Sequence, residues 1–372
     1  MSRRLRSLLL QAGSFVLAGG LLYLALRGVE LEDLRAVLRQ ATLWWLIPMV
    51  AVALLSHLVR AWRWQALIEA LPSEPGHPRP TLPLGLAFSS IMIGYMVNYA
   101  APRLGEPVRA AHAAARTRLR FSSVFGTVFA ERVLDLLTLL VALASLPLVF
   151  LHDLGPIRAL LAALWPADLD PRLPGLVAGA IVGLGLVVLI VYRRVLIRSE
   201  SPLRGGWTER ALAAFQAFRD GFVTLLHTRR RLFVVATTAL MWGCYLGMAY
   251  LPFRMLNLAE AYGITLLDAW GIMLIGALGM VIPSPGGIGS YHYVTIQTLV
   301  HLYGFEAVAA AGYAVLGHAL QLVLYTLVGA LCLLQQGARL RTLHARVSSS
   351  HRPPSPTEPE RPVPSDHGTP MS

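Results

Sequence analysis

Long apolar runs alternate with short polar segments along almost the whole chain. The strongest runs occupy residues 8–26, 43–62, 122–151, 174–192, 232–252 and 306–334. A run of about 18 or more apolar residues can cross the hydrocarbon core of a membrane as a helix. The pattern therefore predicts an all-α, polytopic membrane helix bundle. The first run follows three arginines but lacks a small-residue cleavage site, so we interpret it as a retained helix.

Two further apolar segments, residues 84–101 and 264–300, are interrupted by glycine, proline and polar residues. We interpret both as re-entrant, the first from the cytoplasm and the second from outside. Ordinary kinked spans are the alternative, and they would raise the number of spans from six to eight. Interrupted segments in corresponding positions of two halves are typical of inverted-repeat transporters and mark the binding site. We therefore expect an inverted repeat.

Composition supports the membrane interpretation and explains the charge. The chain is 55% hydrophobic and 14% charged, whereas soluble domains carry about a quarter charged residues. All 32 basic residues are arginine and the net charge is +12. Such a charge would suggest a nucleic-acid partner in a soluble protein, but here membrane topology explains it, and we expect no nucleic-acid partner.

Arginine placement predicts the orientation, because cytoplasmic loops of membrane proteins are enriched in basic residues. Of the 32 arginines, 25 fall in segments that we place in the cytoplasm, six fall outside, and Arg132 lies within a span. Both termini are therefore expected on the cytoplasmic side of the cytoplasmic (inner) membrane. The cytoplasmic segments are Met1–Ser7, Arg60–Pro83, Pro102–Arg120, Arg193–Arg231 and the tail from Gln335; the outer ones are Arg27–Ala41, His152–Leu173 and Pro252–Gly263.

The domain organisation is simple. Residues 1–346 form the predicted membrane domain, and residues 347–372 form a tail of serine, proline and charged residues that we expect to be disordered. Residues 204–228 read as an amphipathic helix on the cytoplasmic surface. Two cysteines within predicted spans allow no disulfide framework. No metal-binding pattern occurs, and we expect no cofactor.

A first polar motif, Asn98 to Arg109, ends the first interrupted segment. It carries Arg103, Glu106 and Arg109 at intervals of three, so a helical turn would place them on one side. Proline and glycine end the preceding helix, and a new helix beginning beside two arginines suits an anion. The alternative is a loop whose arginines only enforce topology.

A second motif places Glu131, Arg132 and Asp135 inside a long apolar run. Glu131 and Asp135 are four residues apart and therefore share one helix face. Ionisable residues within a span are costly and tend to mark functional paths. The alternative is an internal ion pair that fixes packing.

A third motif lies in the second interrupted segment. Two prolines and three glycines fall within residues 282–289, namely Pro283, Pro285, Gly286, Gly287 and Gly289. They cannot continue a helix, and they allow backbone amides to face a cavity, as in an anion-binding nest. A purely structural break between two half-helices is the alternative.

A fourth motif, Arg60-Ala-Trp-Arg-Trp64, lies near the cytoplasmic end of the second span. Its simplest interpretation is an interfacial anchor of aromatic and arginine residues. The alternative is that Arg60 or Arg63 contacts a lipid phosphate. His318 and Gln321 in the last span are interpreted first as interhelical hydrogen-bonding groups.

In this order, the four motifs resemble those of the membrane-region family named after lysylphosphatidylglycerol synthetase, also described as flippase-like membrane proteins. The likeness covers roughly residues 5–335. Ser290-Tyr-His follows the glycine motif where the family often has a nearby glutamate, so that acid's role does not transfer. The segment after the last span is too short for the soluble aminoacyl-transferase domain of two-part synthetases, so we expect no lysyl-lipid synthesis.

The resemblance implies translocation of a phospholipid or polyprenyl-linked lipid headgroup without ATP hydrolysis. Under this hypothesis Arg103, Arg109 and Arg132 hold the phosphate, while Glu106, Glu131 and Asp135 balance the charge and couple to protons. The chain would not be an enzyme, and a homo-oligomer is compatible with the sequence. An intramembrane enzyme, or an accessory or scaffold protein of lipid or envelope-glycan metabolism, remains the alternative.

Overall fold

The computed structural model describes residues 3–71, 80–101, 103–117, 119–146, 216, 230–282 and 284–350. Within these residues every regular element is helical, which confirms the predicted all-α class. The predicted span 174–192 and all but one residue of the amphipathic stretch 204–228 lie outside them. So does the predicted tail beyond residue 350, whereas residues 347–350 end the last helix.

The described elements follow one another in a simple order. They are α1 (Arg3–Leu26), α2 (Leu31–Arg39), the short 3-10 helix η1 (Leu43–Trp45), α3 (Leu46–Ile68), α4 (Leu84–Ala100), α5 (Gly105–Ala114), α6 (Phe121–Leu143), α11 (Arg231–Met255), α12 (Leu258–Ala261), α13 (Leu266–Gly279), η2 (Pro285–Gly287), α14 (Ser290–Tyr303) and α15 (Ala307–Ser350).

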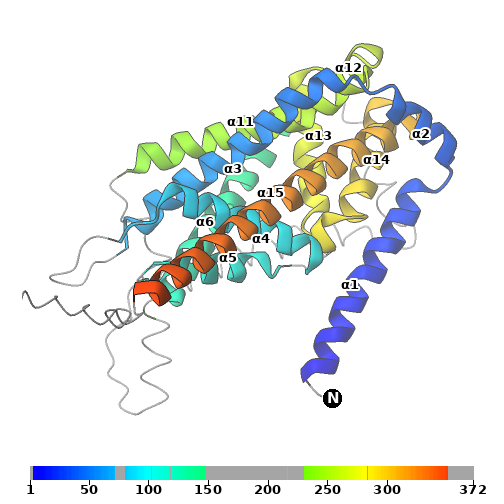
Figure 1. Cartoon of the computed structure of the whole chain (residues 1–372). Helices are drawn as coiled ribbons and strands as arrows, with labels where there is room; N and C mark the ends of the chain where they lie inside the picture. The colour runs from blue at the N-terminus through cyan, green and yellow to red at the C-terminus, as the bar shows by residue number, and fades with distance from the viewer. Residues whose placement is uncertain are drawn as a thin grey trace, which may run out of the picture.

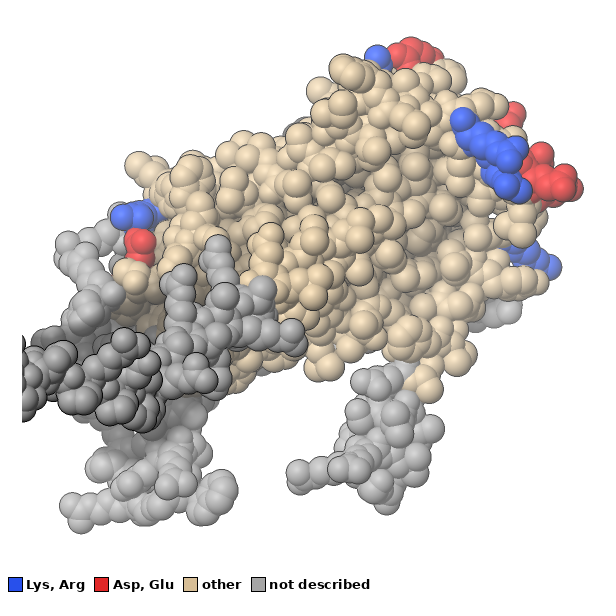
Figure 2. Space-filling view, viewed as in Figure 1, with Lys and Arg blue, Asp and Glu red and all other residues tan. Residues whose placement is uncertain are grey.

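Membrane character is plain from the long helices and from the surface. Among the described helices, Leu43–Ile68, Arg231–Met255 and Ala307–Gln336 are long and apolar enough to cross a membrane. A fourth span is added if Ala12–Leu26 and Leu31–Arg39, which meet at a bend of 82°, count as one. Figure 2 shows charged side chains gathered at the ends of the molecule, with a broad uncharged surface between them. The chain is therefore a multi-pass helical membrane protein.

Two antiparallel helices, α3 and α11, pack side by side along much of their length (Figure 1). At one end the Arg254 guanidinium lies 5.0 Å from the ring of Trp45. At the other end the rings of Trp62 and Phe233 are 6.2 Å apart. The helix α3 continues to Ile68, six residues past the predicted span. The fourth motif therefore lies within α3, which packs against α4 and α6 as well as α11.

The first interrupted segment, residues 84–101, forms the single helix α4, which makes a hairpin with the following helix α5. The second forms the hairpin α13–α14 (Figure 1). Glycines make these close contacts possible, because a side chain would collide with the opposite helix. A Cβ atom on Gly105 would lie 2.2 Å from the Gly94 carbonyl oxygen. In the second hairpin, a Cβ atom on Gly279 would lie 2.9 Å from the Ser290 carbonyl oxygen.

The hairpins enter the bundle from opposite ends. The first starts where α3 ends, since the Gln65 amide donates a hydrogen bond of 2.6 Å to the Leu82 carbonyl. The second starts near the opposite end, after α11 and α12. Their tips meet inside the bundle, where Gly286 of η2 packs against the ring of Tyr99 at the end of α4.

Among the described elements, one order of helices occurs twice. A long helix, a hairpin and a second long helix are formed by α3, α4–α5 and α6, and again by α11, α13–α14 and α15. The contacts between these two sets differ in extent, since the contact of α4 with α15 is much larger than that of α13 with α6. The first hairpin helix α4 packs against α15, α13 contacts α6, and the two leading helices α3 and α11 pack against each other.

The contact between α4 and α5 can be tested with Gly105→Ala. The added methyl group would collide with the Gly94 carbonyl and the Asn98 side chain. Overpacking of this kind costs about 1–3 kcal/mol, so the midpoint of thermal unfolding in detergent should fall. Gly243→Ala is the matched control, because nothing lies within 4 Å of its Cβ position. Equal midpoints for the two variants would contradict the tight contact.

Candidate functional site

Glu131, on α6, is the centre of a buried cluster of charged side chains. It is 0% exposed. Arg60 Nη1 and Arg63 Nη2 donate to its Oε1 atom at 2.8 and 3.0 Å. Arg109 Nη2, from α5, donates to the other oxygen, Oε2. One carboxylate therefore joins three guanidinium groups from two different helices.

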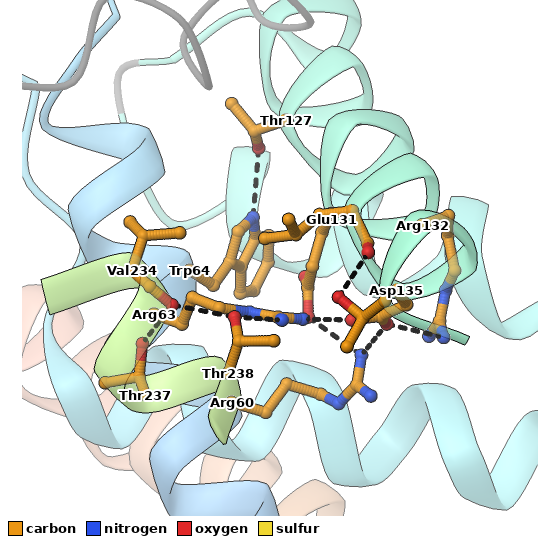
Figure 3. A network of polar contacts seen from close by, with 12 residues as sticks. Arg60, Arg63, Trp64, Thr127, Glu131, Arg132, Asp135, Val234, Thr237 and Thr238 are labelled. Atoms are coloured by element: carbon orange, nitrogen blue, oxygen red, sulfur yellow. Dashed lines mark hydrogen bonds and ion pairs between the residues drawn. The ribbon is translucent and has the colours of Figure 1, made fainter. Parts of the chain in front are cut away.

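Asp135 lies one turn further along α6 and accepts from the same two arginines of α3. Arg60 Nη1 lies 3.0 Å from Oδ2, and Arg63 Nη2 lies 2.6 Å from Oδ1. Figure 3 shows the side chains of Arg60 and Arg63 reaching toward Glu131 and Asp135, with dashed lines marking the contacts. The spacings explain the fit, since residues three or four apart share a helix face. Each helix thus presents two charges of one sign to its neighbour.

Neutral groups satisfy several of the remaining donors. Arg60 Nη2 donates to the Tyr245 hydroxyl at 2.6 Å, and Arg63 Nη1 donates to Thr238 Oγ1 at 3.1 Å. Both acceptors belong to α11, and neither was predicted from the sequence. Thr238 and Tyr245 are seven residues apart and so share a face of that helix. This seven-residue spacing of polar groups within an apolar span was the sequence signal that could have identified them.

Arg109 is held in a different way. Its guanidinium carbon lies 4.2 Å from the centre of the Trp64 ring, a geometry that favours a cation. The Trp64 indole N–H donates to Thr127 Oγ1 at 2.9 Å. The Nε and Nη1 atoms of Arg109 are buried and have no hydrogen-bond partner. This arginine therefore keeps unused donors inside the protein.

The cluster opens to the surface on one side. There Arg132 is 36% and Glu106 28% exposed in their side chains, and Asp135 is 17% exposed. Arg132 Nε lies 3.4 Å from a Glu106 oxygen, and Arg132 Nη1 lies 3.5 Å from an Asp135 oxygen. Arg132 is thus the guanidinium group of the cluster that an incoming molecule meets first.

The cluster has more positive than negative charge. Its four guanidinium groups, on Arg60, Arg63, Arg109 and Arg132, face three carboxylates, which leaves a net charge of +1. Excess positive charge together with free N–H donors suits an anion such as phosphate. In the part of the chain that the structure describes, no group of three or more histidine, cysteine, aspartate or glutamate side chains is arranged to hold a metal ion.

Three of the four sequence motifs therefore meet in one place. The predicted residues that converge are Arg60, Arg63, Glu106, Arg109, Glu131, Arg132 and Asp135. The interfacial-anchor interpretation is wrong for two of them, because Arg60 is 3% and Arg63 0% exposed. Their guanidinium groups pair with carboxylates inside the bundle and do not lie at the membrane interface.

The rest of the first motif shapes the hairpin tip. Asn98 Oδ1 accepts a hydrogen bond of 2.8 Å from the backbone N–H of Gly105, the first residue of α5. Arg103 precedes this helix, is exposed and has a positive φ of 64°. It therefore does not share a helical turn with Glu106 and Arg109, contrary to the expectation from their spacing.

The glycine–proline motif forms the tip of the second hairpin, with Pro283 outside the described residues. Gly286, Gly287 and Gly289 all have positive φ and pack against Tyr99, Met280 and the Ala18 carbonyl. The amides of Gly287 and Ile288 donate to carbonyls within the motif, those of Ser284 and Pro285. In this structure the motif, with Pro285 buried in it, provides close packing, and these two amides are engaged internally.

A comparison with protein-family models identifies a match. The family model described as the lysylphosphatidylglycerol synthase TM region matches residues 11–329. That range includes all four motifs and every charged residue of the cluster. A search of curated proteins finds no match.

Glu131→Gln tests whether the cluster stabilises the fold. The variant leaves three buried guanidinium groups with one negative charge fewer. Removing one partner of a buried pair costs about 3–5 kcal/mol, so folded, monodisperse protein should be lost on size-exclusion chromatography.

Glu260→Gln is the control, because its partner Arg254 is 33% and Glu260 itself 61% exposed in the side chain. Exposed pairs contribute about 0–1 kcal/mol, so this variant should behave like the wild type. Wild-type stability of Glu131→Gln would show that the cluster does not hold the helices together.

Proposed function

The chain belongs to the family of the lysylphosphatidylglycerol synthase TM region, and from this premise we propose that it translocates the headgroup of a phospholipid or polyprenyl-linked lipid across the cytoplasmic membrane. The family itself suggests a role connected with membrane lipids. The specific step, headgroup translocation, is the proposal.

One observation carries the proposal: a buried, net-positive charge cluster that opens to the surface at Arg132. Charges inside a membrane protein are costly and are retained mainly for function. Well-packed apolar residues often stabilise a fold as well as a buried ion pair does. A phosphate diester would neutralise the excess charge, so the cluster suits a substrate that carries one negative charge.

The arginines would have different roles in binding the phosphate. Arg132 receives the phosphate at the exposed edge, and Arg109 offers two donors, Nε and Nη1, that lack protein partners. Arg103 is exposed three residues before Glu106, so its Cα lies within about 11 Å of the Glu106 Cα. Glu131 and Asp135 hold Arg60 and Arg63 in place, which keeps the positive charge fixed in position.

The two hairpins would form the path. We propose that α4–α5 and α13–α14 are re-entrant and belong to inverted repeats, in keeping with the repeated element order and with the packing of α5 on α6 and of α14 on α15. Movement of one repeat against the other would open the site to each side in turn. The lipid tails would remain in the bilayer while the headgroup crosses between the repeats.

Transport fits the cluster better than catalysis of a chemical conversion. A general acid or base needs a carboxyl group that is free to exchange a proton with the substrate. Glu131 and Asp135 each accept from at least two guanidinium groups, so protonating either would strand those donors. We therefore propose that the chain moves its substrate unchanged.

Translocation can be measured with fluorescent phosphatidylglycerol in proteoliposomes, by following chemical quenching of the outer-leaflet label. Wild-type protein should move label from the inner to the outer leaflet. Arg103→Gln with Arg132→Gln should slow this at least about tenfold, since hydrogen bonds to charged groups contribute about 1.5–3 kcal/mol each.

Arg35→Gln with Arg39→Gln is the matched control, because it also removes two exposed arginines, both from α2. It should translocate at the wild-type rate. Equal translocation rates for the two double variants would contradict the proposed role of the cluster. A parallel assay with a labelled polyprenyl phosphate distinguishes the two lipid classes.

The proposed orientation is tested by cysteine labelling in a background without Cys244 and Cys332. Glu260→Cys and Arg116→Cys replace exposed residues near opposite ends of the bundle. An impermeant maleimide should label the first variant in intact spheroplasts and the second only after permeabilisation. The reverse pattern would place the termini outside.

A further inference from the structure

Two buried histidines are in contact in the second set of helices, α11 and α13–α15. The rings of His292 on α14 and His318 on α15 have centroids 4.9 Å apart. Both histidines are 6% exposed. His318 was expected to form an interhelical hydrogen bond, but its Nε2 atom is buried without a partner.

This histidine pair occupies the place that Arg109 and Glu131 occupy in the first half. In each half, the helix that follows a hairpin tip meets the next long helix through one buried side chain from each. Glu131 is ten residues from the start of α6, and His318 is eleven residues from the start of α15. Both therefore lie about 15–17 Å along their helices, counted from opposite ends of the bundle.

The surroundings of the two pairs differ in charge. Besides His292, the described titratable groups with ring contacts to His318 are Tyr291 of α14 and Tyr99 of α4, at 5.3 and 6.2 Å. From α11 and α1 the neighbours are neutral: Pro252 packs against Gly317, and the Ala18 carbonyl packs against Gly289. Within the described residues no carboxylate or guanidinium group forms a hydrogen bond or ion pair with either histidine.

A third buried histidine lies between the two pairs. Both ring nitrogens of His57 lack partners, and its ring lies 4.5 Å from Tyr95 and 4.4 Å from Tyr325. His57 is one turn before Arg60 on α3, and Tyr95 is one turn before Tyr99 on α4. The rings of His57, Tyr95 and Tyr99 thus extend from the charge cluster to the histidine pair. His57 is therefore the alternative proton-binding group that the test must distinguish from the pair.

We infer that His292 and His318 form a second binding station for a phosphate-bearing headgroup, at which the anion binds together with a proton. The inference rests on the proposed translocation and deepens it. It assigns proton coupling to the histidines, in place of the carboxylates of the charge cluster.

The physical reason is the need for charge balance in an apolar interior. A phosphate anion needs a cation beside it, and only proton uptake by histidine can supply one here. A protonated histidine pair equally needs an anion, since no carboxylate of the described residues pairs with it. Proton binding therefore strengthens binding of the phosphate anion, and by thermodynamic linkage anion binding strengthens proton binding by the same factor. The first station is charged at every pH, whereas the second is charged only when protonated.

Binding of dihexanoyl phosphatidylglycerol to the purified full-length protein in neutral detergent tests the inference without requiring transport. Titration calorimetry in two buffers of different ionisation enthalpy gives the protons taken up for each lipid bound. Wild type should take up a proton, and its affinity should rise about tenfold for each unit that the pH falls between 8 and 6. His318→Gln and His292→Gln should each abolish the uptake and flatten the pH dependence.

His301→Gln is the matched control, because His301 is an exposed histidine on the same helix α14. It should retain the wild-type pH dependence. Using two single variants guards against a folding defect in either, and thermal midpoints confirm that each is folded. A second arm with inorganic phosphate distinguishes a lipid headgroup from free phosphate as the ligand.

Several results would overturn the inference. These are no detectable binding, pH-independent binding by the wild type, pH dependence retained in both glutamine variants, or dependence lost only in His57→Gln. Failure of the proposed function is separate, because it would appear as proton-linked binding without leaflet exchange in proteoliposomes.

Discussion

The structure depends on a single carboxylate, Glu131, that holds three guanidinium groups inside an apolar bundle. Each of these charges would be prohibitively costly alone. They are tolerated only while α3, α5 and α6 keep the register in which Arg60, Arg63 and Arg109 all reach the same carboxylate. Hydrogen bonds to Thr238 and Tyr245 extend this constraint to α11. The first hairpin is thereby tied to the long helices of both halves.

Glycine contacts make the hairpins compact enough to place these charges. Gly94 and Gly105 bring α4 and α5 together, and Gly276 and Gly279 do the same for α13 and α14. The two hairpins then contact each other through Gly286 and Tyr99. The contact between α5 and α6 is made by an ion pair, Arg109 with Glu131, whereas that between α14 and α15 is made by His292 and His318. Under the proposed function, this difference in charge behaviour would link movement of the anion to uptake of a proton.

Several parts of the site could be predicted from the sequence, because they depend on the spacing of residues along one helix. Glu131 and Asp135 share a face by their interval of four, and charges within an apolar run mark a buried site. The role of Arg60 and Arg63 was not accessible in this way. Their place near the end of an apolar run is equally typical of an interfacial anchor, and only the continuation of α3 to Ile68 buries them. Arg103 was misjudged because the hairpin turn interrupts the helical spacing before Glu106.

The sequence by itself determined the helical membrane class, the two interrupted segments and the family. These follow from local hydropathy, from residues that break helices, and from motif order. Only the tertiary structure decided which charges meet. Arg60 lies 71 residues before Glu131 and 185 before Tyr245, and helical periodicity carries no information on how such distant helices cross. The pairing arises because the bundle removes water from all of these groups at once, so each buried charge is stable only beside its counter-charge.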